Sequence, residues 1–421
     1  MIKKTFEKVN EDLYYEKLSN GIDVYMYSTK KTKNFYISIS VKYGARIEKY
    51  KVNSKVCDVI PGSAHFLEHK VMALSENEEI SKRINELGSL ANAWTSYYGT
   101  NYNIFGSINL RENLKLLLDI FYNTNITEKN VSEEKGIIGE EIDMYKDQID
   151  GYLYFKIFKN LFHDSYIKNT VVGEREDISK ITAKSLNKIY KDYYLPNNTF
   201  IIITGDFDPN VIINDIKNYM DKINLKPKTL PKRIKKKDNY TIDVSYEEVK
   251  KDTNNCRVRY AIKIDKSKLN IDSDFLIRSY FNIILSNNFS PTSSLYEKYK
   301  NEDIIINMSN SVNVIDDYVV IVISALCNDG VKFIKNIEKD IENISIKKED
   351  FERKKKLFLK SFILDFDNIE DIEFNICTQI LTQDKIDYDE YSKINNLDYN
   401  VACKLIKLID FSNRSIIKTI K

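Results

Sequence analysis

The amino-acid sequence predicts an α+β protein made of two homologous halves, each with a sheet and covering helices. Short runs in both halves alternate apolar and polar residues with a period of two, and stretches with helical spacing lie between them. A basic segment divides the chain near its middle. The end of the second half, residues 413–417, resembles residues 198–202 at the end of the first. Both segments follow a predicted helix and open a predicted strand, which indicates two copies of one fold.

The first half opens with predicted antiparallel strands. Residues 22–26 and 35–41 alternate with a period of two, and the turn at 19–21 predicts that a hairpin leads into the first of them. Further strands are predicted at 89–98, 101–108 and 200–204. Helical spacing predicts helices at 80–87, 114–122, 132–147, 186–194 and 210–223.

The second half repeats this order of strands and helices. Strands are predicted at 240–249, 257–264 and 317–326, and helices at 354–366, 372–381 and 401–409. Between the halves, residues 226–237 contain seven basic residues, two prolines and no acidic residue, which is typical of a solvated linker. We therefore expect domains at 1–225 and 239–421, joined by a linker at 226–238.

Composition excludes several classes of protein. The net charge of the 421-residue chain is only +2, so a general nucleic-acid or membrane-surface binder is not expected. The longest apolar runs have the length of strands, which predicts no transmembrane segment, and the charged N-terminus does not resemble a signal peptide. The five cysteines are scattered and odd in number. This pattern predicts reduced thiols and a cytoplasmic location.

Two of the three histidines in the chain stand four residues apart, with a glutamate directly before the second. Residues 61–63 read as a loop and N-cap, so His65, Glu68 and His69 are expected on one face of a helix. Two imidazoles and a nearby carboxylate are the ligands and the base that a catalytic zinc site needs. This H-x-x-E-H order is the inverse of the commoner H-E-x-x-H motif. The alternative is a pair of histidines that only form hydrogen bonds.

A second candidate segment is the helix predicted at 132–147. Its expected apolar face carries two glutamates seven residues apart, Glu134 and Glu141, among Ile137, Ile138 and Met144. A carboxylate on a core-facing surface is costly unless it is paired or bound to a metal. The glutamates could pair with buried lysine or arginine side chains. Alternatively, Glu141 is the third zinc ligand and Glu134 belongs to the catalytic site as a partner of the ligands.

These segments resemble the pitrilysin/insulinase family of inverzincin peptidases, which includes the mitochondrial processing peptidase. Residues 65–69 resemble the zinc motif of the family. Residues 134–142 resemble its E-(x6)-E segment, with Glu141 at the ligand position, 72 residues after His69. Residues 92–95 resemble the edge strand of the family, and residues 173–198 its signature late in the first domain. Residues 66–70 and 134–145 are most similar to the bacterial YmfH-type subgroup.

The resemblance implies two homologous α+β domains, each an antiparallel sheet covered by helices, that form a clamshell. It implies that His65, His69 and Glu141 hold Zn²⁺ and that Glu68 acts as the general base on the attacking water. It also implies that a peptide substrate binds by strand addition to the edge strand, at Asn92, Ala93 and Trp94. The expected activity is zinc-dependent cleavage of short or unfolded peptides inside a chamber.

One departure from the family pattern bears on activity. Where active members carry an arginine and a tyrosine that contact substrate, this chain has Lys300 and Asn307. We therefore expect a homologous, metal-less partner chain to supply the missing pair in a heterodimer. Two alternatives stay open: maturation of one dedicated peptide by such a pair, and a non-catalytic assembly subunit. The third histidine, His163, does not match a ligand position.

Overall fold

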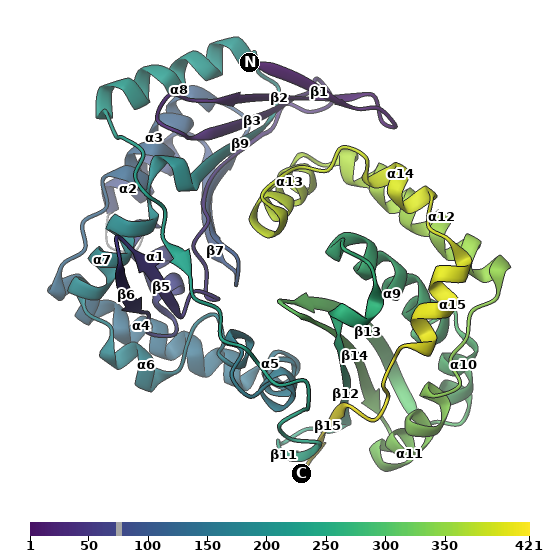
Figure 1. Cartoon of the computed structure of the whole chain (residues 1–421). Coiled ribbons are helices and arrows are strands. Elements are labelled where there is room, and N and C mark those ends of the chain that lie inside the picture. The colour runs from purple at the N-terminus through teal and green to yellow at the C-terminus, as the bar shows by residue number, and fades with distance from the viewer. Residues whose placement is uncertain (73–77) are drawn as a thin grey trace. The chain divides into compact units, whose positions relative to one another are not determined.

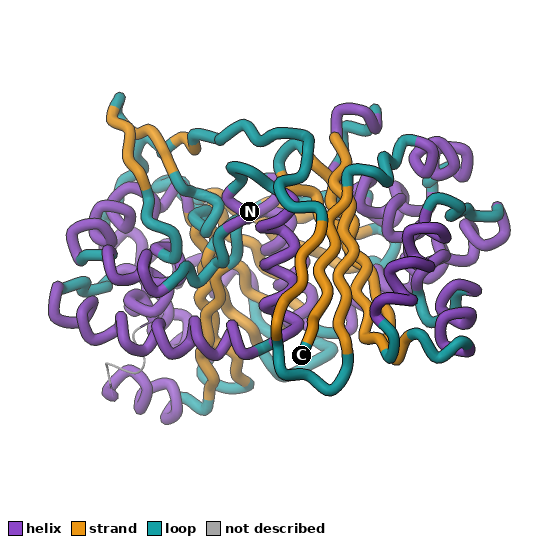
Figure 2. Tube along the Cα trace, turned by 90° about the horizontal axis from the view of Figure 1, so that it is seen from below, coloured by secondary structure: helices purple, strands orange, loops and turns teal. Residues whose placement is uncertain are grey.

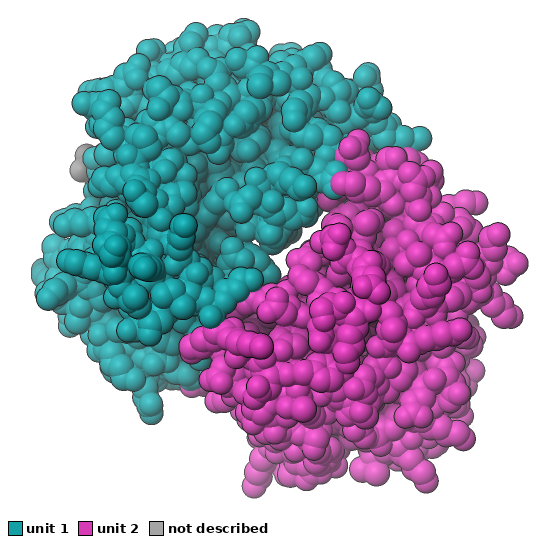
Figure 3. All heavy atoms as spheres, in the orientation of Figure 1, with its two compact units in different colours: residues 1–144, 169–235, 363–388 teal, residues 145–168, 236–362, 389–421 magenta. Residues whose placement is uncertain are grey.

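The computed structural model describes residues 1–72 and 78–421 of the chain (Figure 1). Contacts divide these residues into two compact units, and each unit is assembled from several segments (Figure 3). The first unit contains residues 1–144, 169–235 and 363–388; the second contains residues 145–168, 236–362 and 389–421. The crossing between Lys235 and Lys236 lies within the basic segment 226–238. Each unit also includes a short segment from the opposite half of the sequence.

The first unit is organised around one sheet with the strand order β1-β2-β3-β9-β4-β8-β7. Neighbouring strands are antiparallel, except that β3 and β9 are parallel. The strands, in sheet order, are β1 (Ile2–Phe6), β2 (Glu11–Lys17), β3 (Asp23–Ser28), β9 (Thr199–Gly205), β4 (Phe35–Val41), β8 (Thr100–Gly106) and β7 (Ser89–Thr95).

Local sequence explains the pairing in this sheet. The predicted hairpin joins β2 to β3, and its turn contains Gly21 at φ +94°, a backbone conformation that favours glycine. Strand β9 is buried along its whole length, as its continuous apolar run from Phe200 to Ile203 requires for a central strand. Because β9 enters between β3 and β4, β3 lies parallel to it and β4 antiparallel.

Helices cover both faces of this sheet. One of them, α13 (Ile369–Gln383), comes from the C-terminal half of the sequence and packs on β9 and β4. Its first turn is attached to β9 by a hydrogen bond from Thr204 Oγ1 to the carbonyl of Ile369 (2.9 Å). The remaining helices of the unit are α1 (Ser63–Met72), α2 (Glu78–Glu86), α3 (Leu110–Tyr122), α4 (Glu128–Asp147), α6 (Arg175–Lys180), α7 (Ala183–Tyr193) and α8 (Pro209–Ile223).

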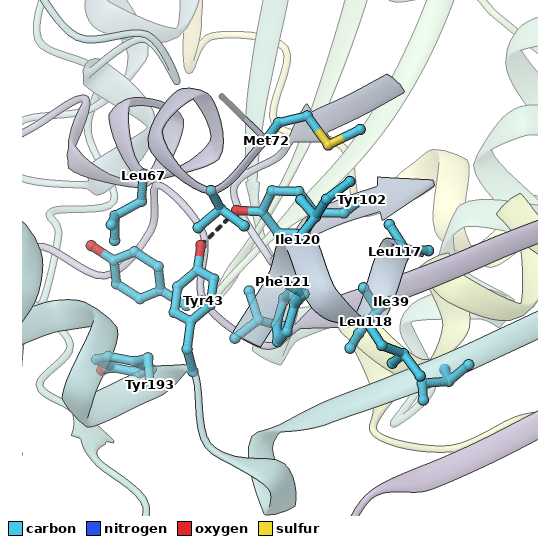
Figure 4. Packing of buried hydrophobic residues seen from close by; sticks show 14 of the residues in the cluster. Ile39, Tyr43, Leu67, Met72, Tyr102, Leu117, Leu118, Ile120, Phe121 and Tyr193 are labelled. Carbon is cyan, nitrogen blue, oxygen red and sulfur yellow. Dashed lines mark hydrogen bonds between the residues drawn. The ribbon is translucent and has the colours of Figure 1, made fainter. Parts of the chain in front are cut away.

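A hydrophobic core joins the sheet to helices α1 and α3 (Figure 4). Leu67 of α1, Tyr102 of β8 and Phe121 of α3 are all fully buried in it. The rings of Tyr102 and Phe121 meet edge to face at 5.5 Å, and the Tyr102 hydroxyl forms a 2.8 Å hydrogen bond with that of Tyr194. Burial of these large side chains holds α1 at a constant depth beside β8.

The second unit contains a sheet with the strand order β11-β15-β12-β14-β13, and these strands lie side by side next to the C-terminus in Figure 2. Here β11 and β15 are parallel and the other neighbours antiparallel. The strands are β11 (Tyr246–Lys250), β12 (Cys256–Asp265), β13 (Ile305–Ile315), β14 (Tyr318–Cys327) and β15 (Arg414–Ile420). The helices are α5 (Ile149–Leu161), α9 (Asp274–Phe289), α10 (Ser294–Asn301), α11 (Gly330–Ile341), α12 (Lys348–Leu364), α14 (Glu390–Asn395) and α15 (Tyr399–Lys407).

The predicted α+β class, with one sheet and covering helices in each half, is confirmed. The main sheet of each unit contains one parallel pair, however, where antiparallel pairing alone was expected. The strand predicted at 240–249 is also shorter than expected, because ordered pairing begins only at Tyr246. The basic segment is not wholly a linker, since Lys232 and Arg233 form β10 and pair with β5 (Lys49–Val52), which also pairs with β6 (Lys55–Asp58). No helix built from the described residues is long and apolar enough to span a bilayer.

Candidate active site

Helix α1 carries the H-x-x-E-H motif and is almost entirely buried. The chain enters it through Gly62, which has φ +84°. A Cβ at this position would lie 2.7 Å from the carbonyl oxygen of Val172 and 3.2 Å from Cα of Gly173. Only glycine meets both requirements, so two segments far apart in sequence fix the start of the helix.

The two histidines of α1 meet one glutamate of α4. The imidazole rings of His65 and His69 lie 4.5 Å apart, as expected for positions i and i+4. Nε2 of His65 is 3.5 Å from one carboxylate oxygen of Glu141, and Nε2 of His69 is 3.4 Å from the other. One ligand atom from each of the three side chains lies within 4.8 Å of the others.

These donors fit a tetrahedral zinc ion. Two ligands bound about 2.0–2.1 Å from zinc at a tetrahedral angle lie roughly 3.4 Å apart. Each histidine nitrogen lies at about this distance from one oxygen of Glu141, although the two oxygens differ. Two imidazole nitrogens and one carboxylate are also the donor set of catalytic zinc sites that keep one position open. His65, His69 and Glu141 could therefore hold a zinc ion.

Glu141 is prepared for this role by its surroundings. Burial opposes ionisation of its carboxyl group, but the imidazoles of His65 and His69 outweigh burial and hold its pKa well below the usual range. The side chain of Glu141 keeps 22% of its surface exposed. An ionised and accessible carboxylate is the form that binds a divalent cation.

Glu134 lies two turns before Glu141 and takes a different position. One of its carboxylate oxygens is 2.8 Å from Nδ1 of His69, and the other is 2.6 Å from Nζ of Lys70. Burial acts against the charge of Glu134, but these two partners lower its pKa below the usual value. Of the two roles weighed for the glutamates, Glu134 combines both: it pairs with a buried lysine, and it contacts a candidate zinc ligand.

The contact with Glu134 determines how His69 can bind a metal. If Nδ1 of His69 donates its hydrogen to the carboxylate, Nε2 is left with a free lone pair directed at Glu141. His65 has no equivalent support, because its buried Nδ1 forms no hydrogen bond with any residue that the structure describes. Sequence reasoning missed Lys70, although a lysine inside a motif helix with apolar neighbours could have marked it as the buried partner.

Glu68 lies beside this group of donors without belonging to it. Its side chain is buried, and one carboxylate oxygen accepts a 2.5 Å hydrogen bond from Thr95 Oγ1 at the end of β7. Burial raises the pKa of Glu68, although His65 and the hydrogen bond from Thr95 oppose the shift. A carboxylate whose pKa is raised toward neutrality is a better general base.

Strand β7 holds the predicted substrate-binding residues Asn92, Ala93 and Trp94. It lies at the end of the sheet, and no strand among the described residues pairs with its outer side. The amide of Ala93 donates a 2.9 Å hydrogen bond to Oδ1 of Asn92. The hydrogen bond between Thr95 and Glu68 attaches the end of β7 to helix α1, so the free edge of the sheet lies next to the group of possible metal ligands.

The structure corrects the predicted apolar face of α4. Glu134 and Ile138 are buried, but Ile137 and Met144 are each about half exposed. The buried face runs instead through Val131, Glu134, Ile138 and Ile142. Gly139 explains the difference: a Cβ there would lie 2.4 Å from Nη1 of Arg175, so a neighbouring side chain approaches the helix backbone closely at this point.

The remaining candidates lie in the second unit. Lys300 donates a 2.9 Å hydrogen bond to the carbonyl of Ile306, and Oδ1 of Asn307 accepts hydrogen bonds from the hydroxyl of Tyr296 and the amide of Met308. Both side chains that replace the family arginine and tyrosine are thus engaged locally. His163 contacts the carbonyl of Thr241 and the carboxylate of Asp243 and is no member of the donor group.

The chain is similar to known proteins along most of its length. Residues 24–175 match the insulinase family (peptidase family M16), and residues 180–358 match the peptidase M16 inactive domain. The zinc protease YmfH of Bacillus subtilis is 32% identical over 298 residues, which cover 69% of this chain and 68% of YmfH. This similarity confirms the resemblance to the YmfH-type subgroup. The second half of the chain, which contains no histidine, is the part that matches the inactive domain.

More distant relatives share parts of the chain or its fold. The mitochondrial-processing peptidase subunit beta of Arabidopsis thaliana is 24% identical over 217 residues, or 50% of this chain and 39% of that protein. The crystal structure of an M16-like peptidase from Alicyclobacillus acidocaldarius superposes with a TM-score of 0.88 at 21% identity. It covers 97% of this chain, and 98% of that structure is matched. The chain therefore belongs to the M16 (insulinase) family of peptidases.

Proposed function

We propose that this chain is a zinc-dependent endopeptidase that cleaves short or unfolded peptides with a metal-activated water. One observation carries the proposal. The donors His65, His69 and Glu141 converge beside the buried carboxylate of Glu68, and Thr95 links this carboxylate to the free edge of β7. Metal ligands, a base and a surface for an extended peptide thus meet at one place.

The residues divide the chemistry between them. Zinc held by His65, His69 and Glu141 would polarise the scissile carbonyl and acidify the attacking water. Glu68 accepts the proton of that water and then donates it to the leaving amine. Thr95 keeps the Glu68 carboxylate in position through its hydrogen bond, and Glu134 fixes the ring of His69.

Strand addition accounts for a preference for extended substrates. A peptide that pairs with the outer side of β7 forms main-chain hydrogen bonds whatever its sequence. The amide of Ala93 now bonds the side chain of Asn92, which a carbonyl of the peptide can replace. Most segments of a folded protein are already held in their own helices and sheets and cannot pair with β7, so the expected substrates are short or unfolded.

The second candidate is a maturation enzyme that is active only with a homologous, metal-less partner chain. Lys300 and Asn307 favour it, because neither reproduces the arginine and tyrosine of active family members, and both side chains are engaged in local hydrogen bonds. The relative from Arabidopsis thaliana is named as one subunit of its peptidase. The cytoplasmic location inferred from the cysteines belongs to this proposal as well.

The test is to load the purified 421-residue chain with zinc and to assay it against a quenched library of unstructured peptides. The Glu68→Gln variant, loaded in the same way, serves as the control. Cleavage by the parent and none by the control supports a self-sufficient peptidase. Bound zinc without cleavage supports the heterodimer, and a chain that binds no zinc supports the non-catalytic assembly subunit and overturns the main proposal.

A further inference from the structure

Helix α13 is attached to the sheet of the first unit through a buried polar cluster. Glu373 is 1% exposed and accepts hydrogen bonds from Ser38 Oγ of β4 and Asn101 Nδ2 of β8. One turn later, the buried Cys377 lies 3.4 Å from Ser40 Oγ. These contacts hold one face of α13 in a constant register against β4 and β8.

This register presents the next residue, Phe374, to the edge of the sheet. The ring of Phe374 lies 6.1 Å from the ring of Trp94 on β7, at an angle of 57°. Pairing places Ser40, Asn101 and Trp94 opposite one another on three adjacent strands, so they share the face of the sheet that α13 covers. An aromatic residue from the C-terminal half of the chain thus lies beside the edge strand.

The same face of β7 carries a second apolar side chain. Leu90 lies four residues before Trp94 and therefore points to the same side of the strand. It is 70% exposed, and Phe374 is 54% exposed. Single exposed apolar residues are common, but here they lie along a strand whose outer side pairs with no strand of the described chain. We refer to Leu90, Trp94 and Phe374 as the aromatic shelf.

An added peptide strand would have two faces with different surroundings. Ala91, Ala93 and Thr95 alternate with the shelf residues, and Thr95 contacts Glu68 of the metal-binding helix. Side chains of the peptide that point to this side meet small residues and the catalytic group. Side chains that point to the other side lie next to the aromatic shelf.

We propose that the aromatic shelf binds large apolar side chains at alternate positions of a peptide paired with β7, so that Phe374 and Trp94 determine substrate preference. This inference rests on the proposed function and names its substrate class. The occupant is the peptide substrate itself, because the shelf continues the strand edge that adjoins the catalytic group. Phe374 adds apolar contact area without taking part in the reaction, so its removal affects peptide binding more than chemistry.

The test uses two unstructured peptides of equal length, one with phenylalanine and one with alanine at alternate positions. For the phenylalanine peptide, Phe374→Ala should lower kcat/KM about tenfold, mainly through KM, since one apolar contact is worth that order of discrimination. For the alanine peptide, Phe374→Ala should lower kcat/KM by less than about twofold. The Phe374→Leu variant should recover most of the preference. Val211 is an exposed apolar residue on α8, so Val211→Ala serves as the matched control. This variant should leave kcat/KM for both peptides unchanged.

A binding measurement separates this inference from the proposed function. Trp94 is the only tryptophan in the chain, so its fluorescence reports on the shelf directly. In the Glu68→Gln variant, the phenylalanine peptide should shift the emission of Trp94, and the alanine peptide should shift it less. Such binding without cleavage by the parent would uphold the shelf and refute a peptidase that is active by itself. Cleavage with equal preference for both peptides, or binding that leaves the emission unchanged, would refute the shelf alone.

Discussion

Nζ of Lys70 lies 2.6 Å from Oε2 of Glu134, and the two side chains are only 0% and 3% exposed. The other oxygen of the same carboxylate contacts His69, so the lysine, the glutamate and a candidate zinc ligand form one chain of contacts. The carboxylate is buried and charged only because Lys70 and His69 compensate it. Lys70 provides no ligand atom itself, but through Glu134 it supports the orientation of the candidate ligand His69.

Replacing Lys70 with methionine should destabilise the protein by about 3–5 kcal/mol, because Glu134 is then left buried without its cationic partner. Zinc affinity should fall by about 10–100-fold, the usual cost of disturbing a residue that orients a ligand. Urea unfolding and chelator competition measure the two effects. The Lys70→Met/Glu134→Gln double variant should recover most of the stability. Lys82→Met, which removes an exposed ion pair of α2, should cost no more than about 1 kcal/mol.

Substitutions of the metal ligands and of the base should have different effects on zinc binding and on the rate of cleavage. Glu68→Gln keeps all three donors, so zinc binding should persist while the rate falls by about a thousandfold or more. His69→Ala and Glu141→Gln each disrupt the donor set and should lose both zinc and activity. Metal content after dialysis, measured beside peptide cleavage, distinguishes the cases. An active Glu68→Gln variant would overturn the assignment of the general base.

Zinc affinity should depend strongly on pH. Burial lowers the pKa of His69, but Glu134 and Glu141 outweigh it and raise the pKa to about 9 in the metal-free protein. Because zinc binds only the deprotonated ring, its apparent affinity should rise by about tenfold per pH unit until pH approaches about 9. Chelator competition across this range tests the slope. In the Glu134→Gln variant the apparent zinc affinity should reach its plateau at a lower pH. An unchanged pH profile would refute the role of the Glu134 carboxylate in raising the pKa of His69.

The metal-free protein should show the opposite trend in the contribution of His69 to stability. A folded-state pKa above that of the unfolded chain means that the contribution is complete below about pH 6.5. It is lost as the pH rises through about 9. The proton on His69 that stabilises the metal-free protein is thus the proton that zinc must displace.

Glu373 makes a separate prediction for stability. Burial raises its pKa to about 7, while the hydrogen bonds from Ser38 and Asn101 oppose the shift. Because the folded state holds this proton more tightly, its stability should decrease between about pH 4.5 and pH 7 and then level off. Glu373→Gln removes this dependence and should stabilise the protein at about pH 8 by on the order of 3 kcal/mol. Urea unfolding of the metal-free chain near pH 5 and pH 8 checks the difference, with the exposed Glu370→Gln as the matched control.

The sequence predicted which candidate ligands lie together better than it predicted the residues that support them. Spacing alone placed His65, Glu68 and His69 on one helical face, because a motif within one helix needs no information about the fold. The face of α4 was only partly predicted, since its burial depends on which side Arg175 approaches at Gly139. Lys70 was missed because a lysine is ordinarily exposed, and its pairing with Glu134, 64 residues later, depends on the packing of two helices.

The limits in the second half have similar causes. Strand β13 was not predicted, because the consecutive polar residues Ser309, Asn310 and Ser311 interrupt its period of two. Helix α13 was predicted as a helix from its own spacing. Its place on the sheet of the first unit was not predicted. The reason is that Glu373 of this helix bonds to Ser38 and Asn101, which lie more than 270 residues away in the sequence.

The position of α13 in the first unit also affects the order in which this unit can be completed during synthesis. A ribosome completes the strands of the first unit long before residues 363–388 emerge, so a nascent sheet must wait with one face uncovered. That face carries Ser38, Ser40, Asn101 and Asn103, side chains that water can solvate in the meantime. A face of leucine and valine would instead invite aggregation during synthesis. The polar cluster thus protects the unfinished chain first and anchors the helix afterwards.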